Sequence, residues 1–138
     1  MYIDTLKLTN FKRFESLELS LDEKINVFIG INGAGKTSVL RAITYGLGPL
    51  VNFWYQQGVA SPNAREVHKH MARVNDRVRL ESVYPVEIYL SVIDAQTVIS
   101  AGITYKNEND RSFSGYPPSA YDRTGKLGST LPVFAVYD

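Results

Sequence analysis

Hydrophobic and polar residues alternate near the N-terminus with the period of two that is typical of half-buried β-strands. This alternation predicts a strand over residues 17–21, followed by a turn at residues 22–24, and the apolar residues Ile3, Leu6 and Leu8 predict an earlier strand over residues 1–9. The next residues, 25–29, form the short apolar run Ile-Asn-Val-Phe-Ile. Such a run is expected of a strand buried on both faces, so we predict a third strand directly before Gly30.

After Gly30 the spacing of apolar residues changes from that of a strand to that of a helix. One face of this helix would carry Val39, Leu40, Ile43 and Leu47. The pattern therefore predicts a helix from Lys36 to Leu47. We expect the helix to end there because Gly46 and the pair Gly48-Pro49 disfavour its continuation.

The middle of the chain mixes loop, helix and strand patterns. Residues 52–62, which include Phe-Trp-Tyr, are predicted to form a loop, and the basic residues 64–74 are predicted to form a short helix. A clear alternation returns at residues 86–92, which predicts a strand. Residues 97–105 are expected to pair with it in antiparallel orientation across a turn at residues 94–96.

The C-terminal part is the most polar. Residues 106–130 contain several Gly and Pro and are predicted to form a long loop, and residues 133–137 are predicted to form a last buried strand. The sequence stops at Asp138, directly after that strand. Because a domain rarely ends on a buried strand that nothing covers, we expect residues 1–138 to be a fragment of a longer chain.

The composition is that of one globular domain: 138 residues, of which 44% are hydrophobic and 21% charged. Lys and Arg number 15 against 14 Asp and Glu, so the net charge of +1 does not by itself favour nucleic-acid or membrane binding. The absence of cysteine excludes disulfides and thiolate chemistry and is consistent with a reducing cytoplasm. No apolar run approaches the roughly 18–20 residues that a membrane span needs, so we expect no membrane partner.

One motif carries specific chemistry. Residues 30–37, Gly-Ile-Asn-Gly-Ala-Gly-Lys-Thr, match G-x-x-x-x-G-K-[ST] at every fixed position. This phosphate loop follows a predicted strand and opens a predicted helix, which is the context that the motif requires. Its glycines allow backbone N–H groups to face phosphate oxygens. Lys36 is expected to reach the β- and γ-phosphates of a nucleotide, and the Thr37 hydroxyl is expected to ligate Mg²⁺.

The order strand, Asn10-Phe11-Lys12-Arg13-Phe14, strand, strand and phosphate loop resembles the N-terminal lobe of the ABC-type ATPases in the SMC/RecF group. The run LTNFKRFESLELSLDEKINVFIGINGAGKTSVLRAI, about a quarter of the chain, carries this resemblance, and Asn32 within it is typical of that group. A second match, at residues 131–137, is similar to a bacterial branch of the group. That branch contains OLD-type nucleases, retron- and Septu-associated defence ATPases and predicted ATP-binding virulence proteins.

The resemblance implies an α/β fold: the nucleotide-binding lobe of an ABC-type P-loop NTPase, with a mixed sheet and an antiparallel β-subdomain. It implies the cofactors ATP and Mg²⁺, with the adenine near the connection after the first strand. The nucleotide-binding residues expected from it are Lys12, Arg13, Gly30, Asn32, Gly33, Ala34, Gly35, Lys36, Thr37 and Ser38, with Thr37 also on the metal. For the full-length protein it implies a homodimer or larger oligomer, a nucleic-acid or effector-nuclease partner, and a cytoplasmic role in bacterial defence or DNA-related processes.

The family's ATPase machinery is incomplete in this sequence. Its signature motif, its Walker B aspartate with the adjacent glutamate and its switch histidine are not visible. Residues 133–137 followed by Asp138 superficially resemble a Walker B strand, and Gln96 can be read as the family's metal-contacting glutamine. No signature helix precedes Asp138, however, and Gln96 falls in a predicted turn. We therefore assign no catalytic residue and expect this chain to bind ATP without appreciable turnover, as the front half of a full-length ATPase.

Two weaker patterns remain. His68 and His70 lie two positions apart, and a metal site made of both would need a strand there, because a helix turns such residues away from each other. A solvated basic face is the favoured interpretation. Together with Arg77 and Arg79, that face could instead contact nucleic-acid phosphates.

Two rival functions use the same phosphate loop. A P-loop kinase or transferase would need a lid with clustered arginines, and residues 106–130 hold only Arg111 and Arg123. A non-hydrolysing binding module, in which the nucleotide merely orders an interface, would need only the loop.

Overall fold

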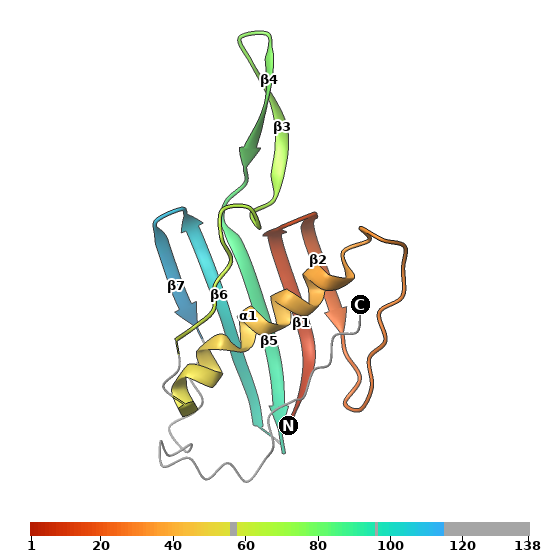
Figure 1. Ribbon diagram of the computed structural model, residues 1–138. Coiled ribbons are helices and arrows are strands. Elements are labelled where there is room, and N and C mark those ends of the chain that lie inside the picture. The colour runs from red at the N-terminus through yellow and green to blue at the C-terminus, as the bar shows by residue number, and fades with distance from the viewer. Residues whose placement is uncertain (56–57, 96, 115–138) are drawn as a thin grey trace.

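The computed structural model describes residues 1–55, 58–95 and 97–114. Five strands form one sheet in the order β2-β1-β5-β6-β7, and every pairing in it is antiparallel (Figure 1). The strands are β1 (Tyr2–Phe11), β2 (Phe14–Ser20), β5 (Val86–Asp94), β6 (Thr97–Asn107) and β7 (Asp110–Ser114). The predicted strands at residues 1–9, 17–21, 86–92 and 97–105 are therefore confirmed.

A register shift in β1 explains a pattern that simple alternation does not. Ile3, Leu6 and Leu8 are all buried, although Ile3 is out of phase with the other two. The pairing of β1 with β5 slips between Ile3 and Thr5. This bulge returns the next apolar side chains to the inner face of the sheet, so one strand buries residues of both parities.

Helix α1 (Lys36–Tyr55) lies across one face of the sheet and packs on β5 and β6 (Figure 1). The helical start at Lys36 is confirmed, but the predicted end at Leu47 is wrong, as is the loop predicted for residues 52–55. Gly46 lies inside the helix and does not stop it. A Cβ at this position would lie 2.8 Å from the Leu90 side chain. The glycine lets the helix approach the sheet. Leu47 and Leu50 are buried in the same contact, which holds the helix together across Pro49.

The core lies between α1 and the inner face of the sheet. It joins β1, α1, β5 and β6 in one continuous cluster. Its fully buried larger side chains are Phe11, Leu6, Leu8, Ile43, Leu50, Ile88, Leu90, Ile99, Ile103, Val86 and Val92. This cluster fixes the start of α1, and with it the phosphate loop, against the N-terminal strands.

A second, two-stranded sheet replaces the predicted helix at residues 64–74. Strands β3 (Lys69–Val74) and β4 (Arg77–Ser82) pair as an antiparallel hairpin that extends away from the main sheet (Figure 1). The turn between them consists of Asn75 and Asp76, both with positive φ, at 49° and 58°. Two-residue turns of this kind match the twist of the flanking strands and favour Asn and Asp, so the pair Asn75-Asp76 was the sequence signal for a hairpin.

Residues 25–29 do not form the predicted strand. Ile25, Val27, Ile29 and Ile31 are 76%, 72%, 90% and 85% exposed, and within the described residues no strand pairs with this segment. A strand is held by hydrogen bonds to a neighbour, so an apolar run alone cannot form one. The preceding turn is as predicted: the Asp22 carboxylate accepts a 2.8 Å hydrogen bond from the Lys24 N–H.

The remaining predictions concern the C-terminal part. The loop predicted for residues 106–130 is wrong at its start, where β7 pairs with β6. The rest of that loop from residue 115, the strand predicted at residues 133–137, Gln96 and Asp138 all lie outside the described residues. None of the helical residues that the structure describes forms a stretch long and apolar enough to cross a bilayer.

Candidate functional site

The phosphate loop has the backbone geometry that an anion cradle requires. Gly33 and Gly35 adopt positive φ values of +79° and +104°. At Gly35 a side chain is excluded twice over, because a Cβ would also lie 2.5 Å from Cζ of Phe14. The two glycines allow the loop to curl back toward its own start before α1 begins at Lys36.

Lys36 closes this curl. Its ammonium donates hydrogen bonds of 2.6 Å and 3.0 Å to the carbonyl oxygens of Gly30 and Ile31. An ammonium has three N–H donors, so one remains for a phosphate oxygen. The side chain thus braces the mouth of the loop and places a positive charge there, although the sequence motif alone predicted only the contact with phosphate.

The first turn of α1 supplies further donors. The Val39 N–H bonds to the Gly35 carbonyl at 3.0 Å, so the N–H groups of Lys36, Thr37 and Ser38 precede the first helical hydrogen bond. They point out of the helix N-terminus, where the helix dipole favours an anion. Thr37 is exposed, which leaves its hydroxyl accessible to a metal ion. In the loop itself, Gly30 and Asn32 are exposed and Ala34 is half-buried. These residues fit a nucleotide's phosphates and Mg²⁺.

The β1–β2 turn brings Arg13 to the loop. Lys12 and Arg13 form a two-residue turn between the paired residues Phe11 and Phe14. The Arg13 guanidinium donates a hydrogen bond to the carbonyl oxygen of Gly33. Residues 20 positions apart in the chain are therefore in contact at the loop, and this turn forms one wall of the candidate site.

Lys12, the neighbouring candidate, is directed elsewhere. Its ammonium lies 3.3 Å from Oε1 of Glu66, and its backbone N–H bonds to the Glu66 carbonyl at 2.6 Å. Lys12 has a positive φ of 51°, so the turn sends the two adjacent cations in different directions. The structure thus separates two residues that the resemblance grouped together.

Glu66 is a buried ion-pair centre that the sequence analysis did not identify. Only 3% of the residue is exposed, and its carboxylate accepts hydrogen bonds from Tyr45 at 2.8 Å and Arg41 at 3.2 Å in addition to the Lys12 pair. Burial acts to raise the pKa of Glu66, but the hydrogen bonds from Tyr45, Asn63, Lys12 and Arg41 outweigh it and hold the pKa below its ordinary value. Burial, together with the Glu66 carboxylate, raises the pKa of Tyr45 to about 12.

A local sequence signal for Glu66 does exist. Glu66 accepts a hydrogen bond from the Asn63 N–H at 3.2 Å, and the Asn63 side chain accepts one from the Arg65 N–H at 2.9 Å. Asn63 and Glu66 have the spacing of a capping box, but the Asn63 side chain accepts from the N–H of Arg65 and not from that of Glu66. The motif indicates a tight turn, but it does not indicate that the carboxylate is buried.

The histidines do not form the metal site that a strand would allow. His68 is half-buried, and its Nδ1 lies 2.8 Å from the Lys12 carbonyl oxygen, while His70 is exposed on β3. Within the described residues no group of three or more His, Cys, Asp and Glu side chains is placed to hold a metal ion. His68 therefore anchors the β1–β2 turn to the base of the hairpin.

In the described part of the chain a phosphate loop opens the one long helix beside an antiparallel sheet, which is the architecture of the N-terminal lobe of an SMC-type ATPase head. A solved structure from work on the ATP-driven dimerization and DNA-stimulated activation of SMC ATPases superposes with a TM-score of 0.56 and 18% identity, over 83% of this chain and 69% of that one. The likeness confirms the predicted fold class. Residues 1–114 match the AAA ATPase domain family, and the chain belongs to it.

Relatives of this chain include the DNA replication and repair protein RecF from several bacteria. The RecF of Renibacterium salmoninarum is 33% identical over 104 residues, covering 62% of this chain and 26% of that protein. The RecF of Halothermothrix orenii is 33% identical over 107 residues, covering 77% and 24%. That of Clostridium tetani is 53% identical over 45 residues, covering 33% and 12%. The chain thus spans about a quarter or less of the length of these relatives. The SMC/RecF part of the predicted resemblance is confirmed.

Proposed function

We propose that this chain binds Mg·ATP through residues 30–38, with Arg13 beside the nucleotide. The observation that carries the proposal is the position of Lys36, which is held by the carbonyl oxygens of Gly30 and Ile31 at the N-terminus of α1. A glycine turn without a phosphate ligand has no need of an ammonium held in this way. The backbone N–H groups and the third Lys36 donor bind phosphate oxygens, and Thr37 ligates Mg²⁺.

Calorimetric titration with Mg·ATP tests this site. Lys36→Ala is expected to abolish measurable binding, because it removes both the phosphate contact and the brace of the loop. Lys24→Ala is the matched control, since Lys24 is an exposed lysine in the turn before residue 25. An unchanged affinity in Lys36→Ala would refute the proposed site.

We further propose that the chain is the front half of a longer ATPase that forms a homodimer or larger oligomer. The exposed apolar side chains of Ile25, Val27, Ile29 and Ile31 support this proposal, since they form an apolar row that further chain would cover as neighbouring strands. A longer version of the protein is expected to protect the amides of residues 25–29 from hydrogen exchange, whereas in residues 1–138 they exchange rapidly. Rapid exchange in both forms would contradict the proposal.

We propose duplex DNA as the partner and the β3–β4 hairpin as its contact. Residues 69–82 carry four Lys and Arg against two Asp and Glu, while the whole chain has a net charge of only +1. Arg79 lies opposite Ala72, and Arg77 lies opposite Val74, on one face of the hairpin. Both arginines are exposed, and no partner among the described residues binds them. Arg73 differs, because it pairs with Asp76 at 3.2 Å.

Fluorescence anisotropy with a labelled DNA duplex at several salt concentrations tests the hairpin. The double variant Arg77→Ala/Arg79→Ala is expected to weaken binding and to lower the slope of log affinity against log salt by about 2, one for each lost phosphate contact. Lys7→Ala/Lys24→Ala removes the same charge elsewhere on the surface. Equal losses in both double variants would show that only net charge matters and would refute a hairpin site.

The alternatives are a P-loop kinase or transferase and a non-hydrolysing module in which ATP orders an interface. Steady-state phosphate release by the full-length protein, with and without DNA, separates them from an ATPase.

A cytoplasmic role in bacterial defence with an effector-nuclease partner is our proposal for the biological process. The resemblance of residues 131–137 supports it.

A further inference from the structure

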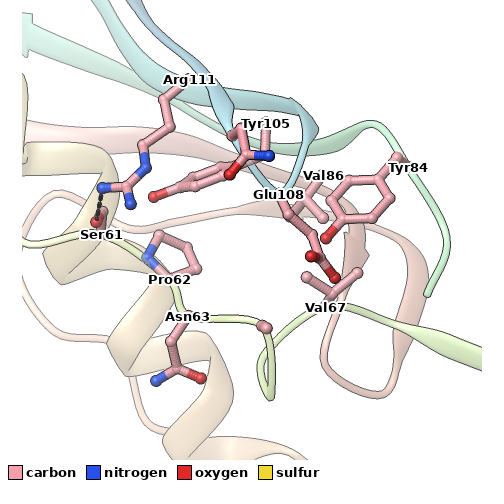
Figure 2. Close-up of a pocket in the computed structure, with 11 residues that line it drawn as sticks. Ser61, Pro62, Asn63, Val67, Tyr84, Val86, Tyr105, Glu108 and Arg111 are labelled. Carbon is pink, nitrogen blue, oxygen red and sulfur yellow. Dashed lines mark hydrogen bonds between the residues drawn. The ribbon is translucent and has the colours of Figure 1, made fainter.

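A cavity of about 410 Å³ lies away from the phosphate loop, between the segment at residues 61–64 and the β6–β7 hairpin (Figure 2). This volume is within the range of small-molecule sites. Its lining includes the aliphatic residues Val67 and Val86. The β6–β7 turn on its rim is fixed by two hydrogen bonds, because the Asn107 side chain accepts from the N–H groups of Asn109 and Asp110 at 2.9 Å and 3.0 Å.

The buried hydroxyl of Tyr105 is the feature of this cavity that most indicates a bound ligand. Tyr105 is 6% exposed, and among the residues that the structure describes its hydroxyl has no hydrogen-bond partner. A buried polar group in this state destabilises the fold, and native proteins rarely retain one without a use. In Figure 2 the hydroxyl points to the side of the cavity where Arg111 and Ser61 lie. The Tyr105 hydroxyl is thus a hydrogen-bond donor without an acceptor, on the same side of the cavity as Arg111 and Ser61.

Arg111 gives this end of the cavity a positive charge. Its guanidinium lies 5.7 Å from the centre of the Tyr105 ring and donates one hydrogen bond, of 3.2 Å, to the Ser61 hydroxyl. A guanidinium has five N–H donors, so several remain for an anion. Among the described residues no carboxylate forms an ion pair with Arg111.

The opposite end of the cavity carries a carboxylate. Figure 2 places Glu108 beside Tyr84, on the side away from Arg111. Burial, together with the Glu108 charge, raises the pKa of Tyr84, which agrees with this proximity. The cavity therefore has a cationic end and an anionic end.

The geometry points to a binding site for a small amphoteric molecule of mononucleotide or dipeptide size. Its phosphate or carboxylate binds Arg111, Ser61 and the Tyr105 hydroxyl, and its N–H donor group binds Glu108. This site is distinct from the phosphate loop, because none of its lining residues belongs to residues 30–38.

Two probes test the site in a Lys36→Ala background, which removes the proposed nucleotide site. Adenosine monophosphate supplies a phosphate with an amino group, and glycylglycine supplies a carboxylate with an ammonium. At least one is expected to shift the amide resonances of residues 61–64 and 105–111 in NMR titrations, with a dissociation constant of about 1 mM or lower. The preferred probe identifies which anion the site takes. A lack of shifts with both probes at that concentration would overturn the proposal.

Single substitutions assign the contacts. Arg111→Gln is expected to weaken the preferred probe about tenfold, which is the loss of a charge-assisted contact, whereas Arg65→Gln, on the same segment as Ser61 but outside the lining, should not. Glu108→Gln should weaken that probe but not inorganic phosphate, which lacks the N–H group. Tyr105→Phe is expected to leave the melting temperature of the free protein unchanged or higher and yet to weaken the probe. A lower melting temperature with unaltered binding would mean that the hydroxyl is structural and would refute its role in the site.

Discussion

The Arg13 guanidinium donates a hydrogen bond to the carbonyl oxygen of Gly33, so the tip of the first hairpin touches the apex of the phosphate loop. Arg13 also lies against Gly35, where a Cβ would be 3.0 Å from the Arg13 Cδ. The loop is thus held between its own lysine, Lys36, and an arginine from another part of the chain. This contact gives Arg13 a testable role that its neighbour Lys12 does not share.

Arg13→Ala is expected to weaken Mg·ATP binding about tenfold, because a charge-assisted contact at the loop is lost. Calorimetric titration measures the effect, and Arg13→Lys, which keeps the charge, should retain part of the affinity. For Lys12→Ala we expect a smaller change in affinity and a larger loss of stability, since Lys12 pairs with Glu66. An unaltered affinity in both alanine variants would contradict the prediction that one of them lies beside the nucleotide.

Gly35→Ala is expected to abolish nucleotide binding and to lower the free energy of unfolding by about 1–3 kcal/mol. The backbone at Gly35 has a φ of +104°, and the added methyl group would collide with Phe14. Calorimetry and denaturant unfolding measure the two effects. Gly58→Ala is the control, because a Cβ there meets no atom within 4 Å and the φ is not left-handed. Normal binding by Gly35→Ala would show that the loop does not use this conformation.

Glu66 makes the stability of the protein depend on acid pH. Its folded-state pKa is lowered, so its contribution is fully present above the ordinary value of 4.5 and is lost as the pH falls through the folded-state pKa. Glu66→Gln is expected to cost about 1–3 kcal/mol at pH 7, because Lys12, Arg41 and Tyr45 lose their charged acceptor. The difference from wild type should shrink as the pH drops below 4.5.

Urea unfolding at a series of pH values measures this dependence. Glu81→Gln is the matched control, because Glu81 is exposed on the β3–β4 hairpin. If the free-energy difference between Glu66→Gln and wild type stays constant down to the lowest pH, then Glu66 is not the group that titrates.

Residues 1–138 alone are expected not to turn over ATP at an appreciable rate. In the proposed function the phosphate loop would hold the phosphates and one face of Mg²⁺, but hydrolysis also needs a carboxylate on the metal's water shell and a group that aims the attacking water, each worth orders of magnitude in rate. Within the described residues no acidic cluster of the metal-binding kind is present. Phosphate release by the purified chain, abolished by Lys36→Ala, would show instead that the catalytic groups are already in this sequence.

The sequence by itself determined the phosphate loop and most of the strands. Phosphate binding of this type is a property of contiguous residues, so glycine, lysine and threonine at fixed spacing predict the loop without knowledge of the rest. The strands at residues 86–92 and 97–105 could also be predicted from the sequence, because an alternating pattern and a short turn define a hairpin locally.

The tertiary structure decided what depends on distant neighbours. Packing of α1 on β5 and β6 stabilises the helix past Gly46 and Pro49, where local helix propensity predicts that it ends. The fold also sends Arg13 to the loop and Lys12 to a buried Glu66, although these two cations are adjacent in sequence. Residues 25–29 have the composition of a buried strand but lack a neighbouring strand among the described residues. Burial and strand pairing belong to segments that meet only in space, so no pattern within one segment can establish them.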